Sequence, residues 1–205
     1  MLKLTNIGKR YRFEWIFRQV NQHFEAGKQY AILGPNGSGK STLLQILSGH
    51  LSPSEGNIDF YFSEKKADRE DVFRQVSMAG PYMDVIEEFT LIESLRFHQN
   101  FKPYLAGLEA KDLIDILQFS KSKNKEVRFF SSGMKQRLKL ALAICSDTSL
   151  LLLDEPTTNL DAQGVAWYRH LIRQYTNDRT LIIASNIKHD YDFCEASLNI
   201  LDFKS

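Results

Sequence analysis

The sequence contains little cysteine and no long apolar run. Only two of its 205 residues are cysteines, Cys145 and Cys194, and neither lies in a Cys-x-x-Cys pair. A disulfide-stabilised secreted domain is therefore excluded, and a reducing compartment is expected. No stretch approaches the roughly 18 uninterrupted apolar residues of a membrane span, and the first residues lack the apolar segment of a secretory signal. We therefore expect a cytoplasmic chain that reaches a membrane only through a partner.

The sequence also lacks an excess of charge of either sign. Lys and Arg number 26 against 25 Asp and Glu, which leaves a formal net charge of +1. This balance gives no argument for binding nucleic acid or an anionic membrane surface, so no nucleic-acid partner is expected. An apolar fraction of 43% and a charged fraction of 25% are ordinary for a globular protein. The length corresponds to one domain, or to one domain with a small insert.

Short apolar stretches predict the strands of an α/β core. Alternation of apolar and polar residues over 2–7 indicates a strand with one solvent-exposed face. Similar alternation predicts strands around residues 58–62 and over 197–203, and the spacing of apolar residues predicts a helix over 41–48. Continuous apolar runs are typical of strands that are buried on both faces. These runs are residues 30–33, 150–153 and 180–184.

The middle of the chain changes to a helical pattern. Thr90 and Glu93 have the spacing of a capping box, which predicts the start of a helix. Apolar residues at helical spacing predict two more helices, over 109–119 and 133–145.

Together these patterns predict one α/β domain. Its core contains a mostly parallel sheet, with an antiparallel β subdomain at the N-terminus, and is made of residues 1–81 and 146–205. A helical subdomain over about residues 82–145 interrupts this core.

A glycine-rich loop follows the first buried strand. It reads Gly-Pro-Asn-Gly-Ser-Gly-Lys-Ser-Thr and matches the phosphate-loop pattern G-x-x-x-x-G-K-[ST] between a strand and a helix. Backbone amides of such a loop form a cradle for phosphate together with the start of the helix. Lys40 is expected to reach the β- and γ-phosphates of a nucleotide, and Ser41 to bind Mg²⁺. The predicted nucleotide-binding residues here are Gly34, Pro35, Asn36, Gly37, Ser38, Gly39, Lys40, Ser41 and Thr42.

Two carboxylates end the buried run of four leucines. Asp154 and Glu155 follow it directly, and α/β sheets place their chemistry at the carboxyl ends of strands. Asp154 is expected to hold Mg²⁺, and Glu155 to orient or deprotonate the attacking water. A strand end with two solvated acids is the alternative interpretation, which the phosphate loop makes less favourable.

Two further segments resemble motifs of the ATP-binding-cassette ATPases. Residues 130–137 read Phe-Ser-Ser-Gly-Met-Lys-Gln-Arg and are similar to the signature motif, which in the family usually reads Leu-Ser-Gly-Gly-Gln. Residues 156–161 read Pro-Thr-Thr-Asn-Leu-Asp and are similar to the D-loop. The order and spacing of all the motifs agree with the family over essentially the whole chain. The resemblance therefore implies an ATPase with a P-loop NTPase core.

The resemblance also implies a dimer. Two such domains, copies of this chain or paralogues, would meet head to tail with ATP between the phosphate loop of one and the signature of the other. Ser131, Ser132 and Gly133 would then act on the γ-phosphate across the interface, and Asp161 would contact the partner subunit. A structural interpretation is compatible with both roles: Ser131 or Ser132 caps one helix, and Asp161 caps another.

An aromatic residue near the N-terminus has two interpretations. Tyr11 matches the family's aromatic residue that stacks on adenine. Alternatively, Tyr11 belongs to an aromatic cluster with Phe13, Trp15 and Phe17.

Two positions depart from the family pattern. Gly80 or Pro81 stands where the Q-loop glutamine is expected, and Gln75 lies too early in the sequence. Asn186 stands where the switch histidine is expected, with His189 three residues later. The departures predict slow hydrolysis, and they leave open whether His189 takes the place of the histidine.

The predicted function is the ATP-hydrolysing subunit of an ABC transporter. In this interpretation Lys40, Glu155 and Asn186 are catalytic, ATP and Mg²⁺ are bound, and a separate integral membrane permease holds the chain at the inner face of the cell membrane. One alternative is an ATP-dependent dimerisation switch with slow hydrolysis. A family member acting on DNA or ribosomes is a third hypothesis, but those proteins usually carry long coiled-coil inserts or two cassettes.

Overall fold

The computed structural model describes residues 1–63, 65–176 and 178–204. The chain folds into two compact units. The first unit comprises Met1–Met78, Ser149–Glu155 and Asp178–Ser205, and the second comprises Ala79–Thr148 and Pro156–Asn177.

An antiparallel sheet begins the first unit. Its order is β2-β1-β4-β5, and its strands are β1 (Leu2–Tyr11), β2 (Glu14–Phe24), β4 (Glu55–Phe62) and β5 (Lys65–Lys66). The alternating apolar residues of β1 face the core, because Leu2, Leu4 and Ile7 are at most 3% exposed. The predicted N-terminal antiparallel subdomain is therefore confirmed.

A second, largely parallel sheet has the order β6-β7-β8-β3-β9. The neighbours β7 and β8, β8 and β3, and β3 and β9 all pair in parallel. Its strands are β3 (Gln29–Leu33), β6 (Val76–Ala79), β7 (Leu150–Asp154), β8 (Thr180–Ala184) and β9 (Ala196–Asn199). Every residue of β7 and of β8 is buried, which agrees with the continuous apolar runs in the sequence.

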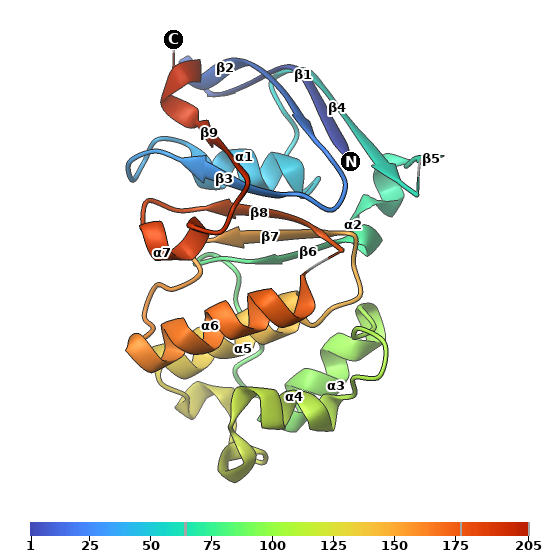
Figure 1. Cartoon of the computed structure of the whole chain (residues 1–205), viewed down its shortest axis with the longest axis vertical. Helices are drawn as coiled ribbons and strands as arrows, with labels where there is room; N and C mark the ends of the chain where they lie inside the picture. Colours follow the sequence, from blue (N-terminus) through green and yellow to red (C-terminus); the bar gives the residue numbers. More distant parts are fainter. Residues whose placement is uncertain (64, 177, 205) are drawn as a thin grey trace. The chain divides into compact units, whose positions relative to one another are not determined.

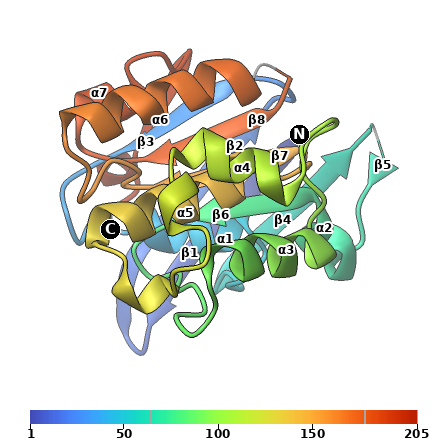
Figure 2. The ribbon, with the colours of Figure 1, turned by 90° about the horizontal axis from the view of Figure 1, so that it is seen from below.

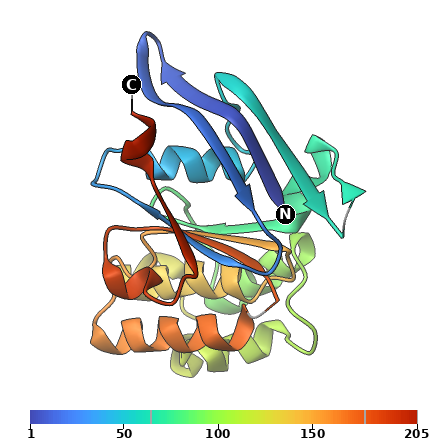
Figure 3. The ribbon, with the colours of Figure 1, turned by 45° about the horizontal axis from the view of Figure 1, so that its top comes forward.

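Helix α1 (Lys40–Leu47) lies between the two sheets of the first unit (Figures 1 and 3). Four of its residues, Leu43, Leu44, Ile46 and Leu47, are fully buried in a core that both sheets share. Two short helices complete the α-helices of this unit, α2 (Val72–Gln75) and α7 (Lys188–Tyr191).

The prediction of a strand over residues 197–203 is wrong in its second half. Strand β9 ends at Asn199, and the 3₁₀ helix Ile200–Phe203 follows. The Asn199 side chain accepts a hydrogen bond from Leu201 N (3.1 Å) and so caps this helix. Alternation alone could not reveal the cap. The other 3₁₀ segments are Arg69–Asp71, Ser120–Ser122 and Val127–Phe129.

Helices make up the second unit. They are α3 (Leu91–Phe101), α4 (Ala110–Leu117), α5 (Ser132–Ile144) and α6 (Ala162–Tyr175). In this unit α3 packs against α4, α4 against α5, and α5 against α6 (Figure 2). The predicted capping box is present, because Thr90 Oγ1 accepts from Glu93 N and the Glu93 carboxylate accepts from Thr90 N. Among the described residues, no helix has the length and apolar character that crossing a membrane requires.

Candidate functional site

The phosphate loop connects β3 to α1 in the first unit. Lys40 is only 4% exposed, and its Nζ donates to Gly34 O (2.8 Å) and Pro35 O (3.1 Å). Gly39 has a φ of 105°, and a Cβ there would lie 2.6 Å from Ile16 Cγ2 on β2, so only glycine fits. The ammonium group of Lys40 therefore lies within the turn of the loop, and the loop packs closely against the β1–β2 hairpin.

The aromatic residues of that hairpin do not form one cluster. Phe17 is fully buried in the core, whereas Tyr11 is 49% exposed and Phe13 is 97% exposed. Trp15 lies under Arg18, whose guanidinium carbon is 4.3 Å from the ring centroid. Lys9 Nζ lies over the Tyr11 ring, 5.2 Å from its centroid. The four aromatic residues thus do not share one cluster, and the Tyr11 ring is exposed.

The acids at the end of β7 are differently placed. Asp154 is 2% exposed, and burial raises the pKa of its carboxyl group, although a hydrogen bond from Ser41 opposes this shift. Its Oδ1 is a buried atom without a hydrogen-bond partner among the described residues. Glu155 has a left-handed backbone (φ 45°), uncommon for a residue with a side chain, and its N–H donates to Ala184 O (2.8 Å).

Asp154 and Ser41 fit a magnesium ion. Both offer oxygen, the ligand atom that Mg²⁺ prefers, and the unpartnered Asp154 Oδ1 is available for coordination. Among residues 1–63, 65–176 and 178–204, no group of three or more His, Cys, Asp and Glu side chains could hold a metal. The ion would therefore take its remaining ligands from water and from a bound phosphate, as Mg²⁺ commonly does.

The turn after β8 brings Asn186 to the phosphate loop. Asn186 Nδ2 donates to Asn36 Oδ1 (3.2 Å). His189 lies on α7, with Nε2 at 3.7 Å from Asp190 Oδ1 and its side chain 47% exposed. The residue at the expected switch position therefore contacts the loop. The sequence gives no signal that Asp190 is buried, because it is a single acid in a mixed polar segment.

The signature and D-loop segments both belong to the second unit. Ser131 is the N-cap of α5, with Oγ accepting from Met134 N (3.2 Å), and Asp161 caps α6 by accepting from Gly164 N (2.7 Å). Both capping interpretations are confirmed. A Cβ at Gly133 would lie 3.0 Å from Asn159 O, so the two segments are in close contact. Gln136, which sequence analysis did not single out, donates to Pro156 O (2.8 Å).

The loop directly after β6, residues 80–90, contains no glutamine. Gln75 precedes the strand, and its Oε1 accepts from Ser149 Oγ (2.7 Å). Gly80 and Pro81 follow the strand directly, as the sequence indicated.

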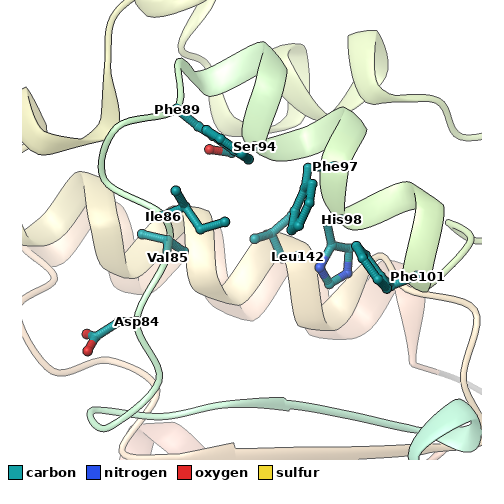
Figure 4. Close-up of a pocket in the computed structure, with 9 residues that line it drawn as sticks. All are labelled: Asp84, Val85, Ile86, Phe89, Ser94, Phe97, His98, Phe101 and Leu142. Atoms are coloured by element: carbon teal, nitrogen blue, oxygen red, sulfur yellow. The ribbon is translucent and has the colours of Figure 1, made fainter.

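A groove with a volume of about 280 Å³ lies in the second unit. Figure 4 shows Ile86, Phe97 and Leu142 pointing toward one another within it. Ser94 is 7% exposed, lines the groove, and its Oγ has no partner among the described residues. The sequence does not reveal this groove, because Phe97 and Phe101 also fit an ordinary buried helix face. The lining residues are Asp84, Val85, Ile86, Phe89, Ser94, Phe97, His98, Phe101 and Leu142.

Comparison with known proteins agrees with these observations. The sequence model of the ABC transporter family matches residues 17–158. The lantibiotic transport ATP-binding protein SrtF of Streptococcus pyogenes is 34% identical over 193 residues, which cover 91% of this chain and 80% of that protein. The bacitracin transport ATP-binding protein BcrA of Bacillus licheniformis is 30% identical over 193 residues, which cover 91% of this chain and 62% of that protein.

The fold is also that of a solved cassette. A dimeric post-hydrolysis structure of the ATP-binding cassette MJ0796, bound to ADP and Pi, superposes with a TM-score of 0.84 at 23% identity. The superposition covers 97% of this chain and 94% of that one. With the phosphate loop, the buried Asp154 and the capped signature helix in place, this chain belongs to the ABC transporter family, as an ATP-binding subunit.

Proposed function

We propose that the chain binds MgATP, dimerises around it, and hydrolyses it to drive a separate integral membrane permease. The observation that carries this proposal is the buried Asp154 Oδ1 at the carboxyl end of β7, which has no hydrogen-bond partner among the described residues. Ser41, in the first turn of the helix after the phosphate loop, acts on the same carboxyl group, so two oxygen ligands for the metal of a nucleotide lie together. The single cassette domain would comprise a core and a helical subdomain over about residues 82–145.

The predicted site residues of the first unit have distinct roles in this proposal. Lys40 and the loop amides bind the β- and γ-phosphates, and Tyr11 stacks on the adenine. Ser41 and Asp154 hold Mg²⁺, which when bound neutralises charge on the phosphate oxygens. Glu155 orients or deprotonates the attacking water. Asn186 donates a hydrogen bond to the γ-phosphate, in the place of a histidine.

The second unit supplies the contacts of a dimer. Ser131 and Ser132 are exposed at the start of α5, and the first amides of a helix favour an anion. We expect these residues and Gly133 to meet the γ-phosphate bound by another copy or a paralogue. Asp161 is also exposed and would contact that partner.

The groove of the second unit is the proposed docking site for the permease. Its apolar walls have an acidic border, since Asp84 lines it and Glu87 and Glu88 follow in the same loop. The chain would reach the inner face of the cell membrane through this contact. The relatives SrtF and BcrA are named for lantibiotic and bacitracin transport, and a transported peptide antibiotic is one substrate class to test.

A second candidate function is a dimerisation switch with slow hydrolysis. Two observations favour it: Asn186, at the expected position of the switch histidine, contacts the phosphate loop, and Gly80 or Pro81 stands where the glutamine after β6 is expected. In this alternative ATP clamps two cassettes together and turnover only resets them.

Glu155→Gln tests the main proposal. It keeps the shape of the side chain and removes the base, so turnover falls by about a hundredfold or more while ATP still binds. Size-exclusion chromatography with MgATP should show the variant as a stable dimer. Glu70→Gln, which changes an exposed acid of the same unit, is the matched control. A variant that stays monomeric while the wild type dimerises, or one that hydrolyses ATP at the wild-type rate, would contradict the proposed mechanism.

Phe97→Ser tests the docking site. Phe97 is 41% exposed in the groove, and Phe73→Ser alters a 59% exposed ring of the first unit as the control. Detergent extracts of cells that express tagged protein should yield a multi-span membrane protein with the wild type and the control. Equal recovery with Phe97→Ser would place the permease elsewhere.

A further inference from the structure

We propose that Asp190 is a positioning residue of the ATPase site. Acting through Ser185, it holds the turn after β8 so that the Asn186 amide faces the phosphate loop. The inference goes beyond the proposed function, and it rests on that function only in assuming that Asn186 acts on ATP turnover.

Asp190 is a fully buried carboxylate on a short helix. Its exposed fraction is 0%, although it lies on the four-residue helix α7 next to the 47% exposed His189. A carboxylate loses much hydration energy on burial and is retained where hydrogen bonds to it compensate. Asp190 therefore has a specific task in this part of the fold.

Ser185 connects Asp190 to the turn. Its Oγ donates to Asp190 Oδ2 at 2.6 Å, a short hydrogen bond of the charge-assisted kind. The same oxygen accepts from Ile187 N at 3.0 Å. One hydroxyl thus binds both Asp190 and the backbone on the far side of Asn186, so the backbone of Asn186 is fixed on both sides.

The turn after β8 lies beside the carboxyl ends of β7 and β3, where the predicted site residues are. Ala184, the last residue of β8, pairs in register with Asp154 on β7 and with Ile32 on β3. Ser185 N donates to Ile32 O at 3.3 Å, two residues before the phosphate loop begins. A shift of the turn would therefore move Asn186 Nδ2 away from Asn36 Oδ1, which it now meets at 3.2 Å.

The first experiment measures the position of Asn186 without ATP. In ¹⁵N-labelled nucleotide-free protein, the side-chain amide resonance of Asn186 is identified by its loss in Asn186→Ala. We expect this resonance to shift in Asp190→Ala and in Ser185→Ala, and to stay in place in Lys188→Ala, a change of an exposed residue of the same helix. Asp190→Asn keeps the volume and one acceptor for Ser185, so it should shift less and serves if Asp190→Ala does not fold.

The second experiment is a double-mutant cycle on kcat. We expect Asn186→Ala and Asp190→Ala each to lower kcat by about threefold to tenfold, the effect of one lost hydrogen bond, with a smaller change in KM. In the Asn186→Ala background, Asp190→Ala should have no further effect on kcat, because it acts through Asn186. A purely structural role would lower kcat equally in both backgrounds.

The outcomes separate the two proposals. An unchanged Asn186 resonance in Asp190→Ala and Ser185→Ala, or additive losses in the cycle, would overturn the role of Asp190 even if the protein is an active ATPase. A wild type without ATPase activity would overturn the proposed function, and the resonance experiment would still decide whether Asp190 positions Asn186.

Discussion

The two units bury polar side chains in different surroundings. In the first unit Lys40, Asp154 and Asp190 are at most 4% exposed and lie at or next to the phosphate loop and the carboxyl ends of β7 and β8. In the second unit the buried Ser94 and the largely buried His98 line an apolar groove.

The difference indicates two kinds of ligand. Burying a polar group without full compensation costs about 1–3 kcal/mol by mutational data, so such groups collect where they have a use. In the first unit, the buried cation and acids and the backbone amides of the loop suit a charged phosphate and its metal. In the second unit, the Ser94 hydroxyl and the His98 imidazole lie among aromatic rings. Such a surface suits the apolar side chains of a protein partner, with one or two polar contacts.

Lys40→Ala should break the phosphate site. The substitution removes the ammonium group that donates to Gly34 O and Pro35 O in this structure. It thereby also removes the charge-assisted hydrogen bonds that this group would donate to phosphate. We expect the affinity for ATP to fall by well over tenfold in a fluorescent-nucleotide titration. Lys28→Ala removes a half-buried lysine paired with Glu25 and is the control. Equal ATP binding by Lys40→Ala and the wild type would disprove the assignment of the loop.

Asn186→His sharpens the comparison within the first unit. A histidine can offer a charged donor to the phosphate, which is worth roughly 1 kcal/mol more than a neutral amide. Steady-state ATPase activity should therefore rise about fivefold to tenfold, while His189→Ala should leave the rate unchanged. An inactive His189→Ala would show instead that His189 supplies the switch function, and would remove the main support for slow hydrolysis.

His98, in the second unit, should make the free energy of unfolding depend on pH. Burial, and then the charge of Lys102, lowers the pKa of His98 from its ordinary value of 6.5 to about 4. Between these values the unfolded chain takes up a proton that the folded protein excludes, so stability falls as the pH falls through 6.5. The free energy of unfolding should drop by about 1 kcal/mol from pH 7 to pH 5.5 because of this group.

Urea unfolding at the two pH values measures this contribution. His98→Gln should remove it, whereas His50→Gln, at an exposed histidine of the first unit, should retain it. The same pH dependence in wild type and His98→Gln would show that His98 is protonated equally in the folded and unfolded chains.

Local patterns predicted most of the elements. The two buried strands β7 and β8, the capping box at Thr90 and the helix caps at Ser131 and Asp161 are confirmed, because each depends on residues close together in sequence. The prediction failed after Asn199, where a side-chain cap turned an alternating segment into a 3₁₀ helix.

The sequence by itself determined the phosphate loop, because nine consecutive residues between a strand and a helix contain the amides, the glycines and Lys40. Only the tertiary structure decided that Asn186 meets Asn36 and that Asp190 is buried against Ser185. The parallel register of β7, β8 and β3 brings these distant segments to one edge of the sheet. Pairing of strands so far apart in the chain depends on the whole core, and no local pattern of residues encodes it.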